Sequence, residues 1–247
     1  MGGSLLPFAL AVHCVFFAGG DPYDIACMFG ISHSSVFLSV DCVIEAVNNC
    51  KQLDITFPTD HAEQQKIAKG FLQKSHLARI GCCVGCIDGI VIWTHKPSKD
   101  NCEEVGVSES KFYCGRKHKF GLNMQATCDH KKRFIDISIV YGTSTSDLMA
   151  FEVSDFRQRL AQPGFFADGL CWFGDNVYVN TPFMVTPYPN VGNNMEKDAY
   201  NFYHSQLRIT VEGAFGLLTK RFGFLRKIAP QQYTVEKTIS TVSLNRQ

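Results

Sequence analysis

The stretch NFYHSQLRITVEGAFGLLTKRFGFLRK, residues 201–227, decides the fold, because it predicts a long helix that packs against a core. Its apolar residues recur at steps of four, four, three and four, as in the buried stripe of a helix. Glu212 is set among apolar and small residues, and Arg208 lies one turn before it on the same side. Either this glutamate pairs with the arginine in an ordinary core helix, or it belongs to a functional site. The stripe consists of Leu207, Val211, Phe215, Leu218 and Phe222.

A second acid lies in GCCVGCIDGIVIWTHKP, residues 81–97. The segment CVGCIDGIVIW within it is apolar on both faces and rich in β-branched residues, which predicts a central strand of a sheet. Asp88 is the only charge in that segment. A buried, ionised carboxylate is costly unless a cation, a metal ion or hydrogen bonds compensate it. We therefore interpret Asp88 as the least structural residue of the chain.

A third acid, Asp175, ends the short apolar strand predicted in LCWFGDNVYV, residues 170–179. The three acids thus stand on three core elements. Oxygen ligands without an ordered set of His or Cys favour Mg²⁺ or Mn²⁺ over zinc. Two such ions, about 3.5–4 Å apart, activate a water and stabilise the leaving oxygen when a phosphodiester is cleaved. The spacing alone does not identify such a site, because a chain of this length contains many acid triples.

Cations gather in two segments, 111–133 and 220–227, although the net charge of the chain is only +1. Phosphate backbones select such clusters, whereas a single cluster is more often a solvated face. Residues 1–50, by contrast, contain no Lys or Arg. The candidate DNA-binding residues are Lys111, Arg116, Lys117, Lys119, Lys131, Lys132, Arg133, Lys220 and Arg221.

Residues 5–50 predict three helices with the pattern of a helix-turn-helix module. Asp21 and Pro22 begin the second helix, and Gly30 ends it. Because this module lacks cations, plain helical packing is favoured over DNA recognition. The apolar residues 5–20 predict a buried first helix more than a signal peptide. No run reaches the ~18 apolar residues of a membrane span.

The 11 cysteines are odd in number and have no regular spacing. Several lie in apolar runs, where a free thiol behaves as a small hydrophobic group. This usage predicts a reducing compartment. Cys82, Cys83 and Cys86 are disfavoured as a zinc site, because no second Cys-x-x-Cys follows with the required spacing.

Strands and helices alternate in the remaining chain. A linker with a polar helix is expected at 53–75, a pair of strands at 119–129 and 133–142, and a helix at 144–160. We expect a helix-turn-helix-like module, a linker with one helix, and then an α/β domain. Their expected boundaries are 1–52, 53–80 and 81–247.

Motifs from four parts of the chain carry a family resemblance. In order, they are CIDGIVIW, then KFYCGRKHKFGLNMQATCD with FIDISIVYGTSTSD, then FGDNVYVNTPFMVTPYP, and NFYHSQLRITVEGAFGLLTKRFGFL. They resemble the DDE-type transposase superfamily, specifically its PIF/Harbinger group and the nucleases derived from it, over about residues 8–240. The resemblance implies an α/β fold: a ribonuclease-H-like mixed sheet flanked by helices and preceded by a small all-α helix-turn-helix-like module.

The resemblance also implies roles for single residues. Asp88 on the first strand, Asp175 after the fourth and Glu212 on a late helix match the metal-binding catalytic acids of the family. The supporting residues are Arg208 and Asn201, near the third acid, and Asp147, the acid of a motif that usually reads His-Asp.

The function implied is divalent-metal-dependent cleavage of phosphodiester bonds in DNA, with Mg²⁺ or Mn²⁺ as the cofactor. Members of the group often share target recognition with a separate Myb-like DNA-binding partner, which fits the cation-free residues 1–50. The resemblance further implies a nuclear protein, with the cytoplasm as a second location, that has no membrane contact and can form a homodimer.

The chain departs from the family pattern at several positions. Ile90 stands where Thr is common, Ser146 replaces a His, and Gly213 stands where Arg is common. The closing helix of the family does not appear before Gln247, so we expect a C-terminally truncated nuclease domain. The alternative is a catalytically inactive transposon remnant that binds DNA or protein. A secreted, cysteine-rich protein with a cleaved N-terminus is a third and less favoured hypothesis.

Overall fold

The computed structural model describes residues 5–140, 142–144 and 146–244. The chain forms two compact units. Strands β1 (Cys83–Thr94) and β3 (Lys119–Cys128) and helix α9 (Met195–Arg221) contribute residues to both of them. Unit 1 comprises Met1–Asp54, Ile92–Gly121 and Leu217–Gln247, and unit 2 comprises Ile55–Val91 and Leu122–Gly216.

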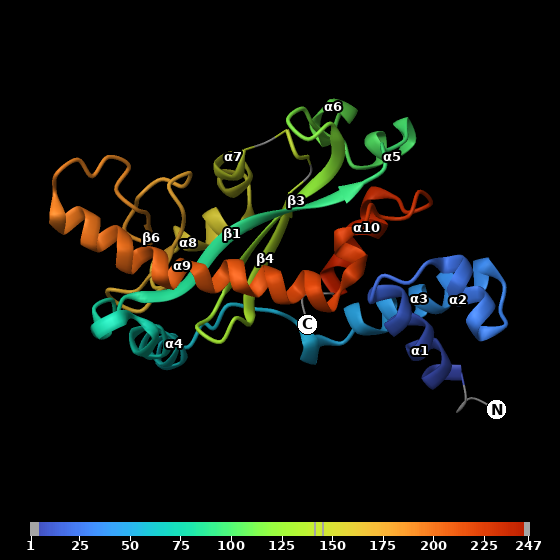
Figure 1. Ribbon diagram of the computed structural model, residues 1–247, viewed down its shortest axis with the longest axis horizontal. Helices are drawn as coiled ribbons and strands as arrows, with labels where there is room; N and C mark the ends of the chain where they lie inside the picture. Colours follow the sequence, from blue (N-terminus) through green and yellow to red (C-terminus); the bar gives the residue numbers. More distant parts are fainter. Residues whose placement is uncertain (1–4, 141, 145, 245–247) are drawn as a thin grey trace. The chain divides into compact units, whose positions relative to one another are not determined.

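Three helices form the N-terminal part of unit 1: α1 (Leu5–Phe17), α2 (Pro22–Phe29) and α3 (His33–Asn48) (Figure 1). As predicted, the Asp21 carboxylate begins α2 by accepting a hydrogen bond from the backbone N–H of Tyr23 at 2.8 Å. Gly30 ends α2 with a φ of 63°, which glycine adopts without strain. The three helices predicted between residues 5 and 50 are present. Its buried side chains include Val12, Phe16, Val36, Val40 and Ile44.

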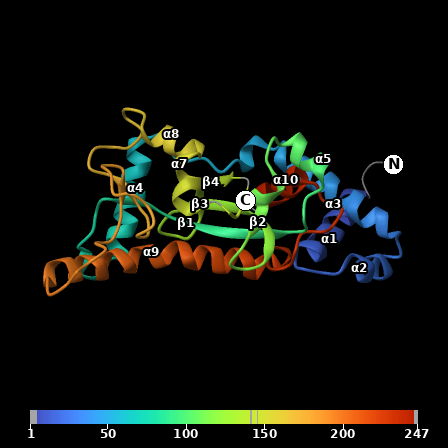
Figure 2. The same ribbon diagram turned by 90° about the horizontal axis from the view of Figure 1, so that it is seen from above.

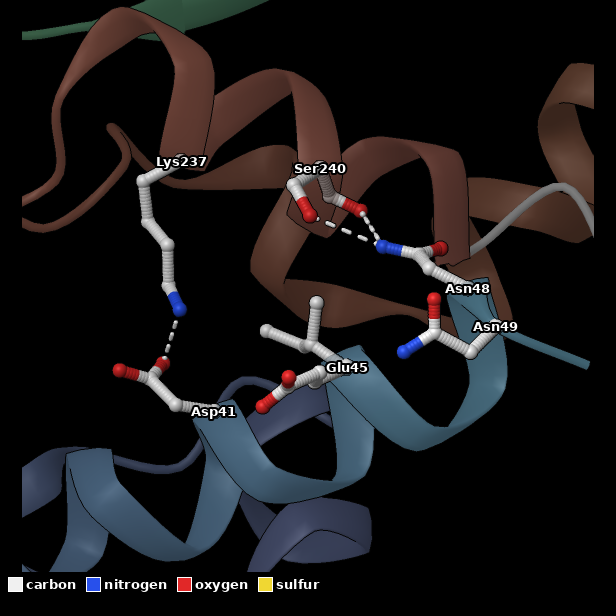
Figure 3. A pocket seen from close by; sticks show the side chains of 7 residues that line it. Asp41, Glu45, Asn48, Asn49, Lys237 and Ser240 are labelled. Atoms are coloured by element: carbon white, nitrogen blue, oxygen red, sulfur yellow. Dashed lines mark hydrogen bonds and ion pairs between the residues drawn. The ribbon is translucent and has the colours of Figure 1, made fainter.

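Helix α10 (Val235–Leu244) packs against α3 within unit 1. Lys237 Nζ lies 2.6 Å from Asp41 Oδ1, and Asn48 Nδ2 donates to Oγ of Ser240 at 2.8 Å (Figure 3). A pocket of about 540 Å³ is lined by these side chains. Unit 1 also contains η1 (Lys51–Leu53), α5 (Lys99–Glu104), α6 (Glu109–Phe112), β2 (Tyr113–Cys114) and η3 (Gly223–Arg226).

No single helix in the described part of the chain is long and apolar enough to cross a membrane. The pair α2 and α3 reaches that length and composition only jointly, with a bend of 97° between the two helices. Helix α1 is apolar but shorter, and several of its side chains are buried in unit 1.

The mixed sheet has six strands in the order β2-β3-β1-β5-β6, with β4 paired to β3. Strand β1 is parallel to β5, β5 is parallel to β6, and β3 is antiparallel to β4. The predicted α/β class, a mixed sheet flanked by helices as in ribonuclease-H-like nucleases, is therefore confirmed. The remaining strands are β4 (Phe134–Val140), β5 (Cys171–Phe173) and β6 (Met184–Val185).

Within unit 2, α9 lies on one face of the sheet, and α7 (Asp147–Glu152) and α8 (Asp155–Leu160) lie on the other (Figure 2). On the α9 face, the Cys86 thiol donates to the carbonyl of Leu207 at 3.3 Å. On the α8 face, the rings of Phe156 and Trp172 are 5.6 Å apart. Because side chains alternate along a strand, neighbouring residues of β1 face different helical layers.

Two helix predictions need correction. The helix expected at 144–160 is two helices, α7 and α8, because Ser154 between them has an extended backbone (ψ 156°) and its hydroxyl donates to the carbonyl of Phe151 at 2.6 Å. Helix α9 begins earlier than expected, since Asn194 Oδ1 accepts from the N–H of Lys197 at 3.0 Å. It also ends earlier, at Arg221, because Phe222 leaves helical geometry (φ −107°, ψ 79°). The polar helix expected after the linker is α4 (His61–Lys74), followed by η2 (His76–Ala78).

Candidate active site

Asp88 lies on β1 where the buried first half of the strand gives way to half-buried residues. Its Oδ1 accepts a hydrogen bond from the N–H of Gly89 at 2.9 Å. Its Oδ2 lies 3.3 Å from Nη1 of Arg208 on α9. Burial raises the pKa of Asp88, and the negative charges of Asp175 and Glu212 raise it further against the opposing effects of Gly89 and Arg208. The charges of both other predicted acids therefore act on the Asp88 carboxylate.

Arg208 connects two of the three predicted acids. Its Nη1 contacts Asp88, and its Nη2 donates to Oε1 of Glu212 one helical turn later. The side chain of Arg208 is 23% exposed and that of Glu212 is 46% exposed, so water screens this pair only in part. The structural and functional interpretations of Glu212 are therefore compatible, because the ion pair lies at the Asp88 carboxylate.

Asp175 follows β5, as predicted. Its Oδ1 accepts from the N–H of Val177 at 2.8 Å, which orders the turn after the strand. Phe173 on the same strand stacks against His204 of α9 at 4.8 Å, and the charge of Asp175 acts on that histidine. This places Asp175 on the α9 side, where its charge acts on Asp88.

The three acids do not form a closed ligand cage. Among the described residues, no three His, Cys, Asp or Glu side chains lie close enough together to hold one metal ion. Arg208 instead supplies the positive charge at Asp88 and Glu212. The donor chemistry fits Mg²⁺ or Mn²⁺, because the groups are carboxylate oxygens. Asn123 Oδ1 is a further buried oxygen nearby that has no hydrogen-bond partner among the described residues.

Asp147 lies on the other side of β1 from Arg208. A Cβ placed on Gly89 would lie 2.8 Å from Asp147 Oδ1, so only glycine leaves room for this carboxylate. Asn123 Nδ2 donates to the same oxygen at 2.9 Å, and Gln125 Nε2 donates to the backbone carbonyl of Asp147 at 2.7 Å. Asp147 thus fixes the start of α7 against β1 and β3, beside Asp88.

Tyr178 and His204 were missed by the sequence analysis. Burial and then the charges of Asp147, Asp88 and Asp175 raise the pKa of Tyr178, whose ring packs against Phe151 of α7 at 5.5 Å. A Cβ on Gly174 would lie 2.7 Å from that ring, and this glycine was the available signal. Burial lowers the pKa of His204, whose Nε2 lies 3.1 Å from the Val185 carbonyl.

Asn201 lies away from the acids. Asn201 makes two hydrogen bonds with the backbone of Tyr188, at 2.8 and 3.0 Å, and precedes Glu212 by about three helical turns. It therefore holds the loop before α9. Every candidate DNA-binding residue is exposed. Unit 2 contains Lys131, Lys132 and Arg133, and unit 1 contains Lys111, Arg116, Lys117, Lys119, Lys220 and Arg221.

Comparison with known proteins gives one family. The sequence model described as DDE superfamily endonuclease matches residues 87–244, more than half of the chain. That range includes all three predicted acids. No curated protein and no solved structure matches the chain.

Proposed function

Because the chain belongs to the DDE superfamily endonucleases, we propose that it cleaves phosphodiester bonds in DNA with Asp88, Asp175 and Glu212 as its catalytic acids. The observation that carries this proposal is the contact of one arginine, Arg208, with both Asp88 and Glu212. The charge of the third acid, Asp175, also acts on Asp88. A half-buried carboxylate with a raised pKa beside other acids is typical of functional sites.

The same proposal includes a divalent metal ion, Mg²⁺ or Mn²⁺, which would draw oxygens of Asp88, Asp175 and Glu212 closer together than they lie in this structure. Such an ion supplies charge neutralisation and an activated water when bound. Two residues of the chain hold the groups around this site. Arg208 binds the Asp88 and Glu212 carboxylates with one guanidinium, and Asp147 fixes β1 from the opposite face.

We also propose the PIF/Harbinger type for this endonuclease, on the strength of the four motifs described above. With it come a nuclear location, DNA as substrate and a separate Myb-like partner. A partner that supplies cations is consistent with an N-terminal module that has none between residues 1 and 50.

The alternative function is binding without cleavage, by a remnant that retains the fold. The lack of a three-ligand group among the described residues favours it. An arginine held permanently between Asp88 and Glu212 would keep these carboxylates from a metal ion.

Cleavage of a labelled DNA duplex in Mg²⁺ or Mn²⁺ tests the proposal. We expect Asp88→Asn and Glu212→Gln each to reduce the cleavage rate about 100-fold or more, because metal ions contribute several kcal/mol to such reactions. Asp168→Asn, which changes an exposed acid of unit 2, is the matched control and should retain the wild-type rate. Cleavage that survives in both site variants would refute the triad. A folded chain that binds DNA but never cuts it would support the alternative.

A further inference from the structure

The turn Asp129–Arg133, which joins β3 to β4, is held rigidly by one buried carboxylate. Asp129 is fully buried, and its Oδ1 accepts from the backbone N–H groups of Lys131 and Arg133 at 2.8 and 2.9 Å. Its Oδ2 accepts from Nε of Arg133 at 2.8 Å and lies 2.7 Å from Nη2 of that residue. Lys132 has a φ of 65°, a backbone conformation that non-glycine residues keep only when their surroundings impose it.

Helix α4 of unit 2 contacts the same turn. A Cβ on Gly70 of α4 would lie 2.4 Å from the His130 ring, so the ring lies directly on the helix backbone. Lys74 Nζ, one turn later on α4, donates to the carbonyl of His130. The turn therefore has a fixed position relative to α4.

The side chain of Lys132 contacts α9 at Gly213, the residue after Glu212. A Cβ on this glycine would lie 2.7 Å from Lys132 Nζ and 3.0 Å from its Cε. The missing side chain at position 213 thus makes room for an ammonium group that comes from a different element. In Figure 1 the turn between β3 and β4 lies beside both α4 and α9.

The turn carries more positive charge than its surroundings balance. Asp129 is already paired with Arg133. In the part of the chain that the structure describes, neither Lys131 nor Lys132 has an acidic group within salt-bridge distance. Both lysines are exposed. Two exposed cations without an acidic partner are suited to a polyanion, not to a single small ligand, and the Lys132 ammonium lies at Gly213 beside Glu212 in the sequence.

We propose that the turn Asp129–Arg133 is a built phosphate-binding site, in which Lys132 holds a backbone phosphate of nucleic acid next to Glu212. The inference rests on the proposed endonuclease function, because that function brings DNA to Glu212. Lys132 positions the substrate without reading its sequence, since phosphates are the same at every nucleotide. Gly213 is part of the site because it admits the lysine.

DNA affinity measured by fluorescence polarisation in EDTA, over a series of salt concentrations, tests this site without cleavage. We expect Lys132→Ala to weaken binding about three- to tenfold for any duplex sequence and to reduce the salt slope by about 1. Lys66→Ala, an exposed lysine of α4 in the same unit, is the matched control and should change neither. The double variant Lys132→Ala with Gly213→Lys places an ammonium group on the same face of α9, beyond the position of the Lys132 ammonium, and should recover part of the affinity.

Several outcomes would overturn the site. Wild-type affinity and slope in Lys132→Ala would do so, and so would equal losses in Lys66→Ala. Binding to polyglutamate with the same dependence on Lys132 would indicate capture of any polyanion. Because these measurements need no metal and no cleavage, an inactive triad does not affect them. Binding that depends on Lys132 without any cleavage would thus reject the endonuclease function and retain the phosphate site.

Discussion

Asp88 and Gly89 are neighbours on β1 whose side-chain positions face opposite layers. Asp88 points toward α9, where it meets Arg208, and the Gly89 position points toward α7, where it leaves space for Asp147. The Asp-Gly pair is thus explained by both helices together. The acid has a function in the site, and the glycine allows the close approach that fixes β1.

Arg208 is the residue on which the metal-free arrangement depends. We expect Arg208→Met to lower the free energy of unfolding by roughly 1–3 kcal/mol in metal-free buffer, because it leaves partly buried acceptors unpaired. Added Mg²⁺ should restore stability, by up to about 2.7 kcal/mol at 100 times the dissociation constant. The wild type should gain less from Mg²⁺, since its arginine competes with the ion. Urea unfolding with and without Mg²⁺ measures both effects.

Arg159→Met is the matched control for that experiment. Arg159 lies 2.5 Å from a single buried acid, Asp136, within the same unit. Its loss should destabilise the protein without creating a site for the ion. Equal stabilisation of wild type and Arg208→Met by Mg²⁺ would show that Arg208 does not compete with a metal.

At the residue scale, the sequence predicted the contacts and candidate residues that depend on spacing along one strand or helix. Asp88 stood out as a lone charge in an apolar strand, and Arg208 and Glu212 are one turn apart on one helix. The contact of Lys132 with Gly213 joins residues about 80 positions apart, and no periodicity encodes it. Tyr178 was missed for the same reason.

At the scale of elements, α9 is aligned with the sheet by His204. The ring stacks on Phe173 of β5 at 4.8 Å, and its Nε2 lies 3.1 Å from the Val185 carbonyl next to it. This contact fixes the helix one turn before Arg208. It therefore connects the strand that leads to Asp175 with the helix that carries Glu212.

The stability of the protein should depend on pH through His204. Burial lowers the pKa of this ring below that of an unfolded histidine, about 6.5. The unfolded chain then binds the proton more tightly, so the stabilisation is complete above pH about 6.5 and is lost as pH falls through the folded pKa. We expect His204→Gln to be less stable at neutral pH and to lose less stability on acidification. Urea unfolding between pH about 5 and about 7.5 measures this difference.

Substitution of the exposed His95 by Gln is the control for the pH series. It should leave the wild-type pH dependence unchanged. If His204→Gln and wild type lost the same free energy on acidification, another group would be responsible for the effect, such as His13, whose pKa burial also lowers.

Helix ends were predicted where a capping residue stands beside a clear apolar period. Helix α2 begins after Asp21 and ends before Gly30, as expected. Asn194 was overlooked because it lies in a loop-like run of polar residues, although it caps α9. Ser154 was included in a longer periodic pattern, although its extended backbone and its hydrogen bond to the Phe151 carbonyl separate α7 from α8. Such ends depend on which local hydrogen bond the backbone accepts.

At the scale of the whole molecule, the units do not follow the order of the chain. Unit 1 combines the N-terminal helices with residues from the middle and the C-terminal part, and unit 2 takes two separate segments. Boundaries placed along the sequence, such as 1–52 and 81–247, divide the chain into continuous segments, whereas each unit consists of separate segments. Long-range packing determines the units, and composition along the chain does not reveal it.

Helix α10 should therefore stabilise the N-terminal helices of unit 1. Its Val235 and Val242 are buried (6% and 1% exposed), and burial of a valine contributes about 1.5–3 kcal/mol. The partly exposed pair Lys237–Asp41 contributes only about 0–1 kcal/mol. We expect a chain ending at Pro230 to lose amide protection in α3 at least tenfold, by hydrogen exchange. Amides paired between β3 and β4 should keep theirs.

The two contributions can be separated with point variants. Val242→Ala should reduce protection in α3 more than Lys237→Met, because the valine is fully enclosed whereas water screens the ion pair. A larger effect of Lys237→Met would mean that polar contacts along the lining of the α3–α10 pocket hold the helix in place (Figure 3). Unchanged protection in the shortened chain would show that α1, α2 and α3 fold without α10, as the three-helix module predicted from the sequence implies.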